Sequence, residues 1–327
     1  MSVQHEAIRR YRSVATVATL LTFILIILGA AVRVFDAGVS CPDWPTCYGH
    51  LFPFPAPAGG YVDEHGAMFA MHQVFLEWFH RLTASVVGLV LLVAVYLAWR
   101  ARQVNRRPWL CGLAALVALA IQVKLGGVTV WQDNVNWSVA LHLGMALVFY
   151  SILQLGIMAA SRPAQSAPTP AQPLTVALWG MSLLMVYVTM LMGAMVSSSY
   201  AGGVCGGLFS CEGRWWPSAD ALQMLHMGHR YAVTLTLLTI AALFMNTRTA
   251  AAPLRKSANV LVVFVAMQVA FGILVLYSFS HYGQFYRLLS VWHLAWATVV
   301  FTVALTGLVK CFWGPKDATV KVLPIHP

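Results

Sequence analysis

Eight long apolar stretches dominate this sequence of 327 residues. Each holds about 20 or more mostly apolar residues, the length that a helix needs to cross a bilayer. Only 9% of the residues are charged, against about 25% in soluble domains, so the chain could not cover a water-facing surface. We therefore predict an all-α, polytopic membrane protein. The predicted spans are 14–35, 74–99, 109–130, 138–160, 174–197, 222–245, 258–279 and 289–312.

The basic residues predict how these spans are oriented. The formal net charge is +10. With the N-terminus in the cytoplasm, 14 of the 20 Lys and Arg residues fall on the cytoplasmic side, as the positive-inside rule requires. This bias explains the net charge without a nucleic-acid partner. It predicts a multi-pass protein of the bacterial inner membrane with both termini in the cytoplasm.

The sequence repeats itself on the two sides of a segment rich in Pro, Ala and Ser, at 161–173. GAAVRVFDAGVSCPDWPTCYG begins at Gly29, and GAMVSSSYAGGVCGGLFSCEG begins 164 residues later at Gly193. Each copy has four spans, an even number, so both copies enter the membrane in the same orientation. We predict parallel repeats, with four-helix bundles over 1–160 and 174–327 joined by a cytoplasmic linker.

Four histidines recur at matched places in the two copies. They lie 62 residues apart in the first copy and 64 apart in the second, each a few residues into an even-numbered span. Every even-numbered span starts at the outer face, so all four should lie at similar depth in the outer part of the bilayer. They are His80 and His142 in the first copy and His229 and His293 in the second.

Two imidazoles on facing helices of one bundle suit the iron of a haem. Haem iron takes axial ligands above and below the ring, and neutral imidazole is a common choice. Helix bundles build such sites from side chains on facing helices. A single intramembrane histidine could equally hydrogen-bond a neighbouring helix. The recurrence of all four favours a haem-binding pair in each bundle, because ionisable residues inside a membrane are rare.

One acidic residue distinguishes the two copies. Glu77 lies three residues before His80, on the same helix face, whereas His226 lies at the matching place before His229. A buried carboxylate can take protons or stabilise positive charge that develops on a substrate. Its alternative role is a structural partner for Arg81. We interpret the first bundle as the reaction site and the second as an electron-carrying site.

An arginine directly follows the first histidine of each copy. These residues are Arg81 and Arg230. A guanidinium group can bind a haem propionate through two parallel hydrogen bonds, or can reach toward the lipid headgroups. The recurrence of the His-Arg pair favours propionate binding.

Two cysteine pairs with the spacing C-x5-C lie in loops on the outer side. The outside of a bacterial inner membrane is oxidising, so each pair can form a disulfide. Such a disulfide could staple its loop or pass electrons toward the haem, and the sequence leaves both roles open. The pairs are Cys41 with Cys47 and Cys205 with Cys211, while Cys111 and Cys311 are predicted packing residues.

Together these features resemble the haem A synthase family. The resemblance covers the chain from about 14 to 312. It rests on VRVFDAGVSCPDWPTCYG at 32–49, EWFHR at 77–81, GHR at 228–230, His142, His293, and the cysteines at 205 and 211.

The resemblance implies that the C8 methyl group of haem O is oxidised to a formyl group, giving haem A for cytochrome oxidase. It implies that water supplies the oxygen, through two hydroxylations and the loss of water. Haem O would bind between His80 and His142, haem b between His229 and His293, and Glu77 would be the catalytic carboxylate. The first cysteine pair would be functional and the second more structural. Implied partners are haem O synthase and cytochrome oxidase assembly factors, and a homo-oligomer is compatible with the sequence.

Two other functions stay open at this point. A di-haem electron-transfer cytochrome, linked to quinol, would explain the four histidines but not the difference between Glu77 and His226. It predicts two haems that stay bound and unchanged. A haem transporter or chaperone would suit parallel repeats, but predicts a readily exchanged haem and a site near the middle of the membrane.

Overall fold

The computed structural model describes residues 3–57, 59–63, 65–161, 171–216, 220–281 and 285–312. Eight helices in these residues are long and apolar enough to cross a membrane, which confirms the predicted all-α fold. The predicted linker lies mostly at 162–170, outside the described residues. The helices are α1 (Val3–Val34), α2 (Met71–Arg100), α3 (Arg107–Trp131), α4 (Asn136–Ala160), α5 (Pro173–Ser198), α6 (Ala221–Thr247), α7 (Ala252–His281) and α8 (Phe285–Phe312). The other elements are the short strands β1 (Tyr61–Val62) and β2 (Met68–Phe69) and the 3-10 helix η1 (Ala201–Gly203).

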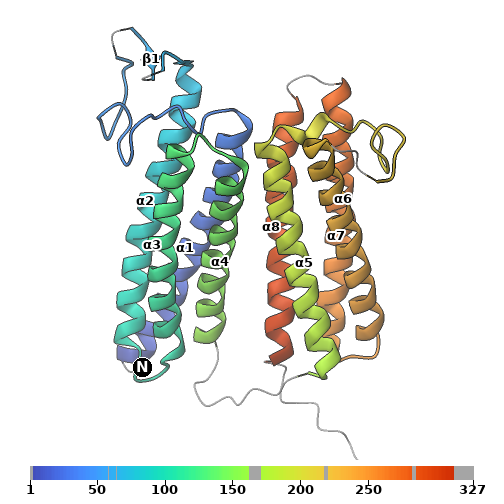
Figure 1. Ribbon diagram of the computed structural model, residues 1–327. Coiled ribbons are helices and arrows are strands. Elements are labelled where there is room, and N and C mark those ends of the chain that lie inside the picture. Colours follow the sequence, from blue (N-terminus) through green and yellow to red (C-terminus); the bar gives the residue numbers. More distant parts are fainter. Residues whose placement is uncertain are drawn as a thin grey trace, which may run out of the picture.

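The helices form two groups of four that stand side by side (Figure 1). Consecutive helices pack as hairpins, α1 with α2, α3 with α4, α5 with α6, and α7 with α8, and these hairpins make the most extensive packing in the molecule. The bundles meet where α1 packs against α8 and where α4 packs against α5. The predicted pair of repeated four-helix bundles is therefore confirmed.

Local signals fix where several helices begin. Proline occupies the first turn of α3 and of α5, where its missing N–H leaves no hydrogen bond unmade. The Asp220 carboxylate accepts a hydrogen bond from the backbone N–H of Gln223 at 2.9 Å and caps α6. These starts lie within a few residues of the predicted ones.

Helix α1 extends beyond the predicted first span toward the N-terminus. Its first turns carry an ion pair, in which Arg10 donates to Glu6 at 2.7 Å, and such i,i+4 pairs support a helix outside the bilayer. Tyr11 on the other face is buried and packs with Ala98 of α2 and Ala160 of α4. The apolar stretch marks only the part of α1 that fills the bilayer, whereas the helix continues as long as it has neighbours to pack against.

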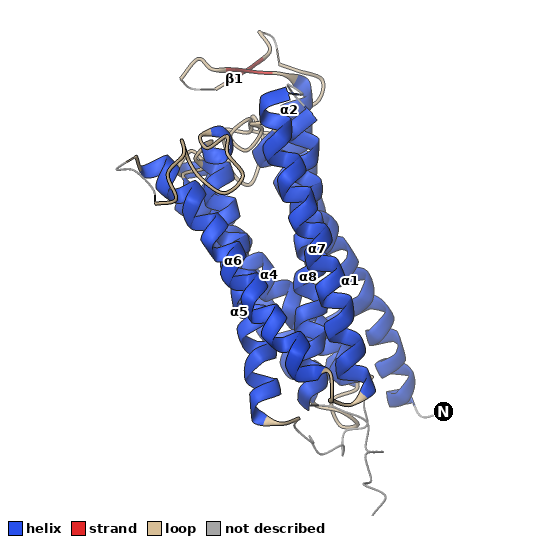
Figure 2. Ribbon diagram, turned by 90° about the vertical axis from the view of Figure 1, so that its right-hand side faces the viewer, coloured by secondary structure: helices blue, strands red, loops and turns tan. Residues whose placement is uncertain are grey.

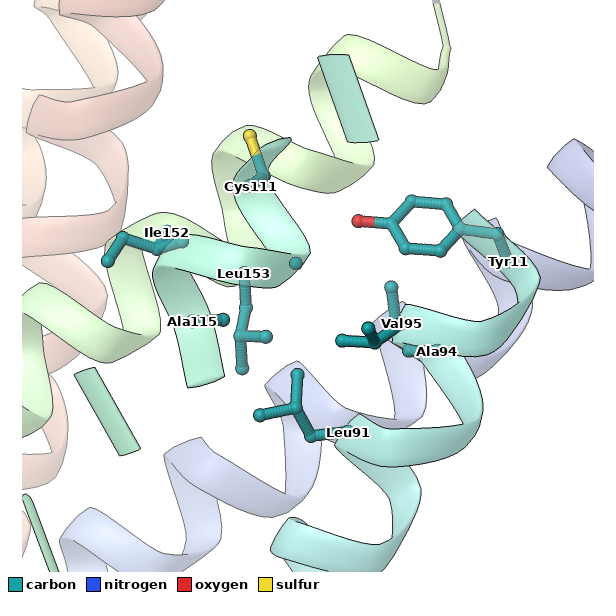
Figure 3. Close-up of a pocket in the computed structure, with 10 residues that line it drawn as sticks. Tyr11, Leu91, Ala94, Val95, Cys111, Ala115, Ile152 and Leu153 are labelled. Atoms are coloured by element: carbon teal, nitrogen blue, oxygen red, sulfur yellow. The ribbon is translucent and has the colours of Figure 1, made fainter. Parts of the chain in front are cut away.

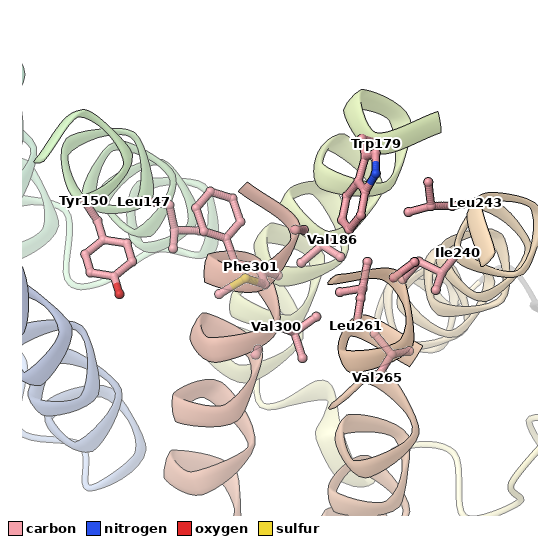
Figure 4. Packing of buried hydrophobic residues seen from close by; sticks show 14 of the residues in the cluster. Leu147, Tyr150, Trp179, Val186, Ile240, Leu243, Leu261, Val265, Val300 and Phe301 are labelled. Carbon is pink, nitrogen blue, oxygen red and sulfur yellow. The ribbon is translucent and has the colours of Figure 1, made fainter. Parts of the chain in front are cut away.

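A shared hydrophobic core holds the two bundles together. Leu147 and Tyr150 of α4 lie in one cluster with Trp179 of α5 and Phe301 of α8 (Figure 4). The Tyr150 hydroxyl also shares a hydrogen bond of 3.1 Å with Thr302. Van der Waals packing and hydrogen bonds, rather than the exclusion of water, drive helix association in a membrane. This close fit therefore fixes the position of one bundle against the other.

A polar contact joins the bundles at the ends that carry the disulfide loops, which are the ends predicted to face outward. Asp36, just after α1, accepts hydrogen bonds from Arg33 at 3.2 Å, from the Tyr200 hydroxyl at 2.9 Å and from Arg287 of α8 at 3.3 Å. Arg33 also donates to the carbonyl oxygen of Ser197 at 3.0 Å. Asp36 and Tyr200 are separated by the 164-residue offset of the repeat, so equivalent positions of the two copies touch each other here.

The outer loops repeat their backbone conformation as well as their sequence. In the loop that follows α1, three residues have a positive φ, in the left-handed region. The residues 164 positions further along the chain have a positive φ too. Such a φ is uncommon for residues other than glycine, so the agreement is specific. The matched residues are Asp36 and Tyr200 (54° and 55°), Tyr48 and Glu212 (53° and 50°), and Gly49 and Gly213 (76° and 77°).

The first outer loop carries an addition that the second lacks among the described residues. Strands β1 and β2 pair antiparallel, with Tyr61 opposite Phe69, and lie above the outer end of α2 (Figure 2). The sequence predicts a loop here and misses this short hairpin. The hairpin adds to the cover over the outer end of the first bundle.

A small cavity lies between α1, α2, α3 and α4 in the half of the first bundle nearer the N-terminus (Figure 3). Its volume is about 10 Å³, and the Tyr11 hydroxyl and Cys111 thiol are the polar side-chain groups on its wall. A buried water needs about two to four polar partners. Leu91 on its wall is eleven residues from His80, about 16 Å along α2. The cavity is therefore separate from the histidines.

Candidate functional site

All four histidines predicted as ligands lie near the outer ends of their helices. Each is six to nine residues past the first residue of an even-numbered helix, about 9–14 Å along its axis. All four side chains are half-buried. The structure thus places His80, His142, His229 and His293 at similar depths.

The histidines lie together in pairs, one pair in each bundle. His80 is near enough to His142 to interact electrostatically, and His293 is near enough to His229. The Nδ1 atoms of His80, His142 and His229 are shielded from solvent and have no hydrogen-bond partner among the described residues. A buried polar atom without a partner is costly. These three rings therefore keep a nitrogen that no hydrogen bond from the described residues uses.

A glutamine stands beside the second histidine of each pair. Gln122 Nε2 on α3 lies 3.4 Å from His142 Nε2. Gln268 Nε2 on α7 lies 3.2 Å from both ring nitrogens of His293 and donates to its carbonyl oxygen at 3.1 Å. Sequence reasoning missed both glutamines. Their signal was present, since IQV at 121 and MQV at 267 are repeat partners.

Glu77 on α2 is buried beneath the first disulfide loop. Its side chain is only 3% exposed. One carboxylate oxygen accepts hydrogen bonds from the backbone N–H of Cys41 at 2.9 Å and the Ser40 hydroxyl at 3.1 Å, and the other accepts from Arg81 at 2.6 Å. The carboxylate is therefore held by three donors from a loop and a helix.

Arg81 links α2 to the same loop. Its Nη atoms donate to the carbonyl oxygens of Cys41 at 3.0 Å, Asp43 at 2.5 Å and Thr46, and to Glu77. The structure thus shows a contact between Glu77 and Arg81, which the sequence offered as the alternative role of Glu77. The predicted binding of a propionate by Arg81 stays a prediction, and these contacts occupy both Nη atoms.

The second bundle repeats this arrangement without a carboxylate. Arg230 Nη atoms donate to the carbonyl oxygens of Cys205 at 2.8 Å and Gly207 at 2.6 Å. His226, at the place of Glu77, is buried, and its Nε2 lies 3.2 Å from Arg230. The two arginines therefore hold equivalent loops and, of the two, only Arg81 also pairs with an acidic group among the described residues.

Both C-x5-C pairs form disulfides, Cys41 with Cys47 and Cys205 with Cys211. All four cysteines are at most 2% exposed. Each disulfide lies in the loop that the arginine of its bundle clamps. The first disulfide is also in direct contact with the candidate catalytic group, because the Cys41 N–H donates to Glu77. Cys111 and Cys311 are free thiols.

The first loop holds further charged and polar groups above Glu77. Burial alone would raise the pKa of Asp43, but hydrogen bonds from Thr46 and the N–H of Gly49 outweigh it and hold the pKa below its usual range. Burial, with the nearby negative charges of Asp63 and Glu77, raises the pKa of Tyr48 to about 12. Asp43 is therefore an anion and Tyr48 a neutral phenol at neutral pH.

Three further histidines lie in the first outer loop or at the start of α2. His50, His65 and His72 are exposed. His50 pairs through its backbone with Cys47 in an isolated bridge. The structure places these three side chains on the surface.

Comparison with known proteins shows the family of this chain. The family model described as cytochrome oxidase assembly protein matches residues 12–305, and the chain belongs to this family. A Heme A synthase of Shewanella oneidensis is 28% identical, over 77% of this chain and 83% of its own. Heme A synthases of Shouchella clausii and Symbiobacterium thermophilum are 25% and 23% identical, over 84% and 93% of this chain and 89% and 92% of theirs.

The paired histidines fit a haem as far as donor chemistry goes. Each bundle supplies two imidazoles from facing helices, which is the ligand set of a six-coordinate haem iron. Three of the four rings have an unsatisfied, shielded nitrogen. The eight spans fit a multi-pass membrane protein.

Proposed function

We propose that this chain is a haem A synthase, a membrane enzyme that oxidises the C8 methyl group of haem O to a formyl group. The observation that carries the proposal is the pair of repeated histidine sites, of which only one has a buried carboxylate beside it. The family match and the names of the relatives support it.

In this proposal the two bundles have different tasks. His80 and His142 bind the substrate haem O, and His229 and His293 hold a haem b cofactor. A bound haem b would supply one-electron redox chemistry, which suits the bundle where His226 stands in the place of the buried carboxylate. We also propose that Arg81 and Arg230 approach the propionates while their Nη atoms hold the outer loops.

Glu77 would act on the reacting methyl group. Conversion of a methyl group and water to a formyl group releases four protons and four electrons in total, so the site needs a proton acceptor. Glu77 and His80 are three residues apart on one helix face, which supports a position of the carboxylate beside the proposed substrate ligand. Burial among three donors fixes its position, and its negative charge would stabilise positive charge on the reacting carbon.

The first disulfide would position this carboxylate. Because the Cys41 N–H and the Ser40 hydroxyl both donate to Glu77, any change in the loop would be felt at the carboxylate. The loop of Cys205 and Cys211 lacks this link and would act as a staple. A redox role for Cys41 and Cys47 is the alternative, and the rate of product formation after selective reduction would distinguish the two.

We propose that the protein lies in the bacterial inner membrane with both termini in the cytoplasm. The haem sites then lie on the outer side. Haem O would arrive from haem O synthase, and haem A would leave toward cytochrome oxidase assembly factors. A membrane-impermeant thiol reagent should label a cysteine introduced at Ser166 only after the membrane is opened. Labelling in intact cells would reverse this orientation.

The direct test of the activity uses a host that makes haem O and no haem A. Expression of the chain should produce haem A, identified by the mass of extracted haems, and the His80→Ala variant should not. A surface variant, His72→Ala, serves as the matched control on the same helix and should behave like the unmodified chain. Failure of the unmodified protein to make haem A, although it accumulates in the membrane, would reject the proposal.

A further inference from the structure

Each of the four paired histidines rests against a glycine of the preceding helix. A methyl group built on any of these glycines would lie 3.2 Å from the Cε1 atom of the histidine ring. A distance of 3.2 Å is shorter than nine in ten of the contacts that Cβ atoms make in proteins. The pairs are Gly29 with His80, Gly126 with His142, Gly193 with His229 and Gly272 with His293.

The geometry is the same in all four pairs. Cε1 is the nearest ring atom and Nδ1 the next, at 3.6–3.9 Å. Every pair lies within one helix hairpin, with the glycine on the odd-numbered helix and the histidine on the even-numbered one. The four rings therefore meet the helix beside them through the same edge, and this holds within each copy as well as between copies.

Some other glycines in these helices are also crowded, but by other side chains: a methyl group on Gly112 of α3 would lie 3.1 Å from Val95, and one on Gly307 of α8 would overlap Trp179. Others have more room. A methyl group on Gly180 of α5 would meet nothing within 4 Å, and one on Gly88 of α2 would meet only Leu119 at an ordinary 3.7 Å. Helical glycine is otherwise unfavourable by about 1 kcal/mol relative to alanine. What sets the four glycines apart is their shared neighbour, because each of them meets the same edge of a paired histidine ring.

The glutamines found beside the histidines lie on the same faces as these glycines. Gln122 precedes Gly126 by four residues, and Gln268 precedes Gly272 by four. Residues at i and i+4 stand one above the other on a helix. Helices α3 and α7 thus hold their histidines at two points, with a close contact from the glycine and a polar contact from the glutamine.

We propose that Gly29, Gly126, Gly193 and Gly272 are positioning residues that set the orientation of the imidazole rings toward the iron. We call them the glycine seats. The proposal rests on the proposed function, because it takes the four histidines as axial ligands. A larger residue at a seat must push the ring by a few tenths of an ångström, which turns the ring plane and changes the bond from imidazole to iron.

The test uses the second bundle, whose haem is expected to stay bound on purification. We compare Gly193→Ala and Gly272→Ala with the matched control Gly180→Ala, which lies on the same helix as Gly193. The readouts are the low-temperature electron paramagnetic resonance spectrum of the oxidised haem and its midpoint potential. Both seat variants should keep helix content and bound haem but show displaced g-values and a shifted potential, and Gly180→Ala should match the unmodified protein.

The variant His229→Ala distinguishes two possible errors, a wrong role for the glycines and a wrong assignment of the histidines as haem ligands. If His229→Ala retains haem with an unchanged spectrum, the histidines are not the ligands and the proposed function loses its basis. If His229→Ala changes the haem, while both seat variants give the spectrum and potential of Gly180→Ala, the glycine seats are wrong and the ligands stand. If one seat variant does not accumulate, the other decides, because both act on the same haem.

Discussion

Replacing Glu77 with glutamine should weaken the attachment of the first disulfide loop to α2. The two carboxylate oxygens of Glu77 accept from three donors, the Cys41 N–H, the Ser40 hydroxyl and Arg81. Glutamine keeps the shape but has one oxygen. Whichever way its amide is turned, the NH2 group faces either the Cys41 N–H or Arg81, and neither can accept a hydrogen bond.

The size of the effect follows from this geometry. The variant loses one hydrogen bond that involves a charged group, which is worth about 1.5–3 kcal/mol. Ser40 can compensate for part of this loss, because its hydroxyl can give its one proton to the carbonyl oxygen of Ala37 at 2.8 Å and accept a hydrogen bond from the glutamine NH2 group. The loss therefore lies toward the lower end of this range. A free-energy change of about 1.4 kcal/mol corresponds to a factor of ten. The population in which the loop is detached should therefore rise by a factor toward the lower end of roughly 10- to 150-fold.

Reduction of the disulfide reports this population. Cys41 and Cys47 are 0% and 2% exposed. A phosphine reductant can therefore reach the disulfide only in molecules whose loop is open. The reduction rate follows the open population when opening and closing are fast. In detergent solution, Glu77→Gln should increase the reduction rate of this disulfide by the same factor. The disulfide of the second loop, which has no contact with Glu77, is the internal control.

Ser85→Ala provides a control on the same helix, because its hydroxyl donates only to the backbone of Arg81. Two results would refute the reasoning. Equal reduction rates in Glu77→Gln and Ser85→Ala would mean that Glu77 does not hold the loop. Equal acceleration of both disulfides would mean that the substitution loosens the whole protein.

Three further predictions concern the packing and the loops. Arg230→Met should accelerate reduction of the second disulfide and leave the first unchanged, because Arg230 holds the Cys205 and Gly207 carbonyls; unchanged rates at both disulfides would contradict this. Gly307→Ala should lower the free energy of unfolding by about 1–3 kcal/mol, because a methyl group at this position overlaps the buried Trp179 ring. If the melting temperature falls no more than in Gly180→Ala, this prediction is wrong. Asp36→Asn should cost about 1 kcal/mol for each of its two half-buried ion pairs, and the cost should fall at high salt. An effect independent of salt would rule out the ionic explanation.

Much of the fold follows from the sequence because a bilayer leaves a chain few options. The spans are as long as the hydrocarbon core is thick, so their number and order follow from apolar length alone. The offset of 164 residues predicts the equivalence of the outer loops, and the matched φ angles at Asp36 and Tyr200 show that it extends to the backbone. The start of α1 is missed because residues 3–13 carry charges, and their helix depends on packing by Tyr11.

The candidate site follows from the sequence only in part. Glu77 and the four histidines stand out because polar groups are rare in spans. Their contacts do not stand out. Arg81 reaches the loop carbonyl oxygens of Cys41, Asp43 and Thr46. This contact depends on how a loop of some 35 residues folds back over α2, which the sequence does not reveal. Glycines are common in membrane helices, so Gly193 gains meaning only once its distance to the His229 ring is known.

The measurement that tests the central claim most directly is the identification of haems extracted from purified protein, unmodified beside Glu77→Ala. The account predicts haem B from both. It also predicts haem O, a hydroxylated intermediate or haem A from the unmodified protein, and haem O or an intermediate, without haem A, from the variant. If both proteins contain only haem B, in two equivalents and unchanged by the substitution, the chain is an electron-transfer cytochrome and the account is wrong.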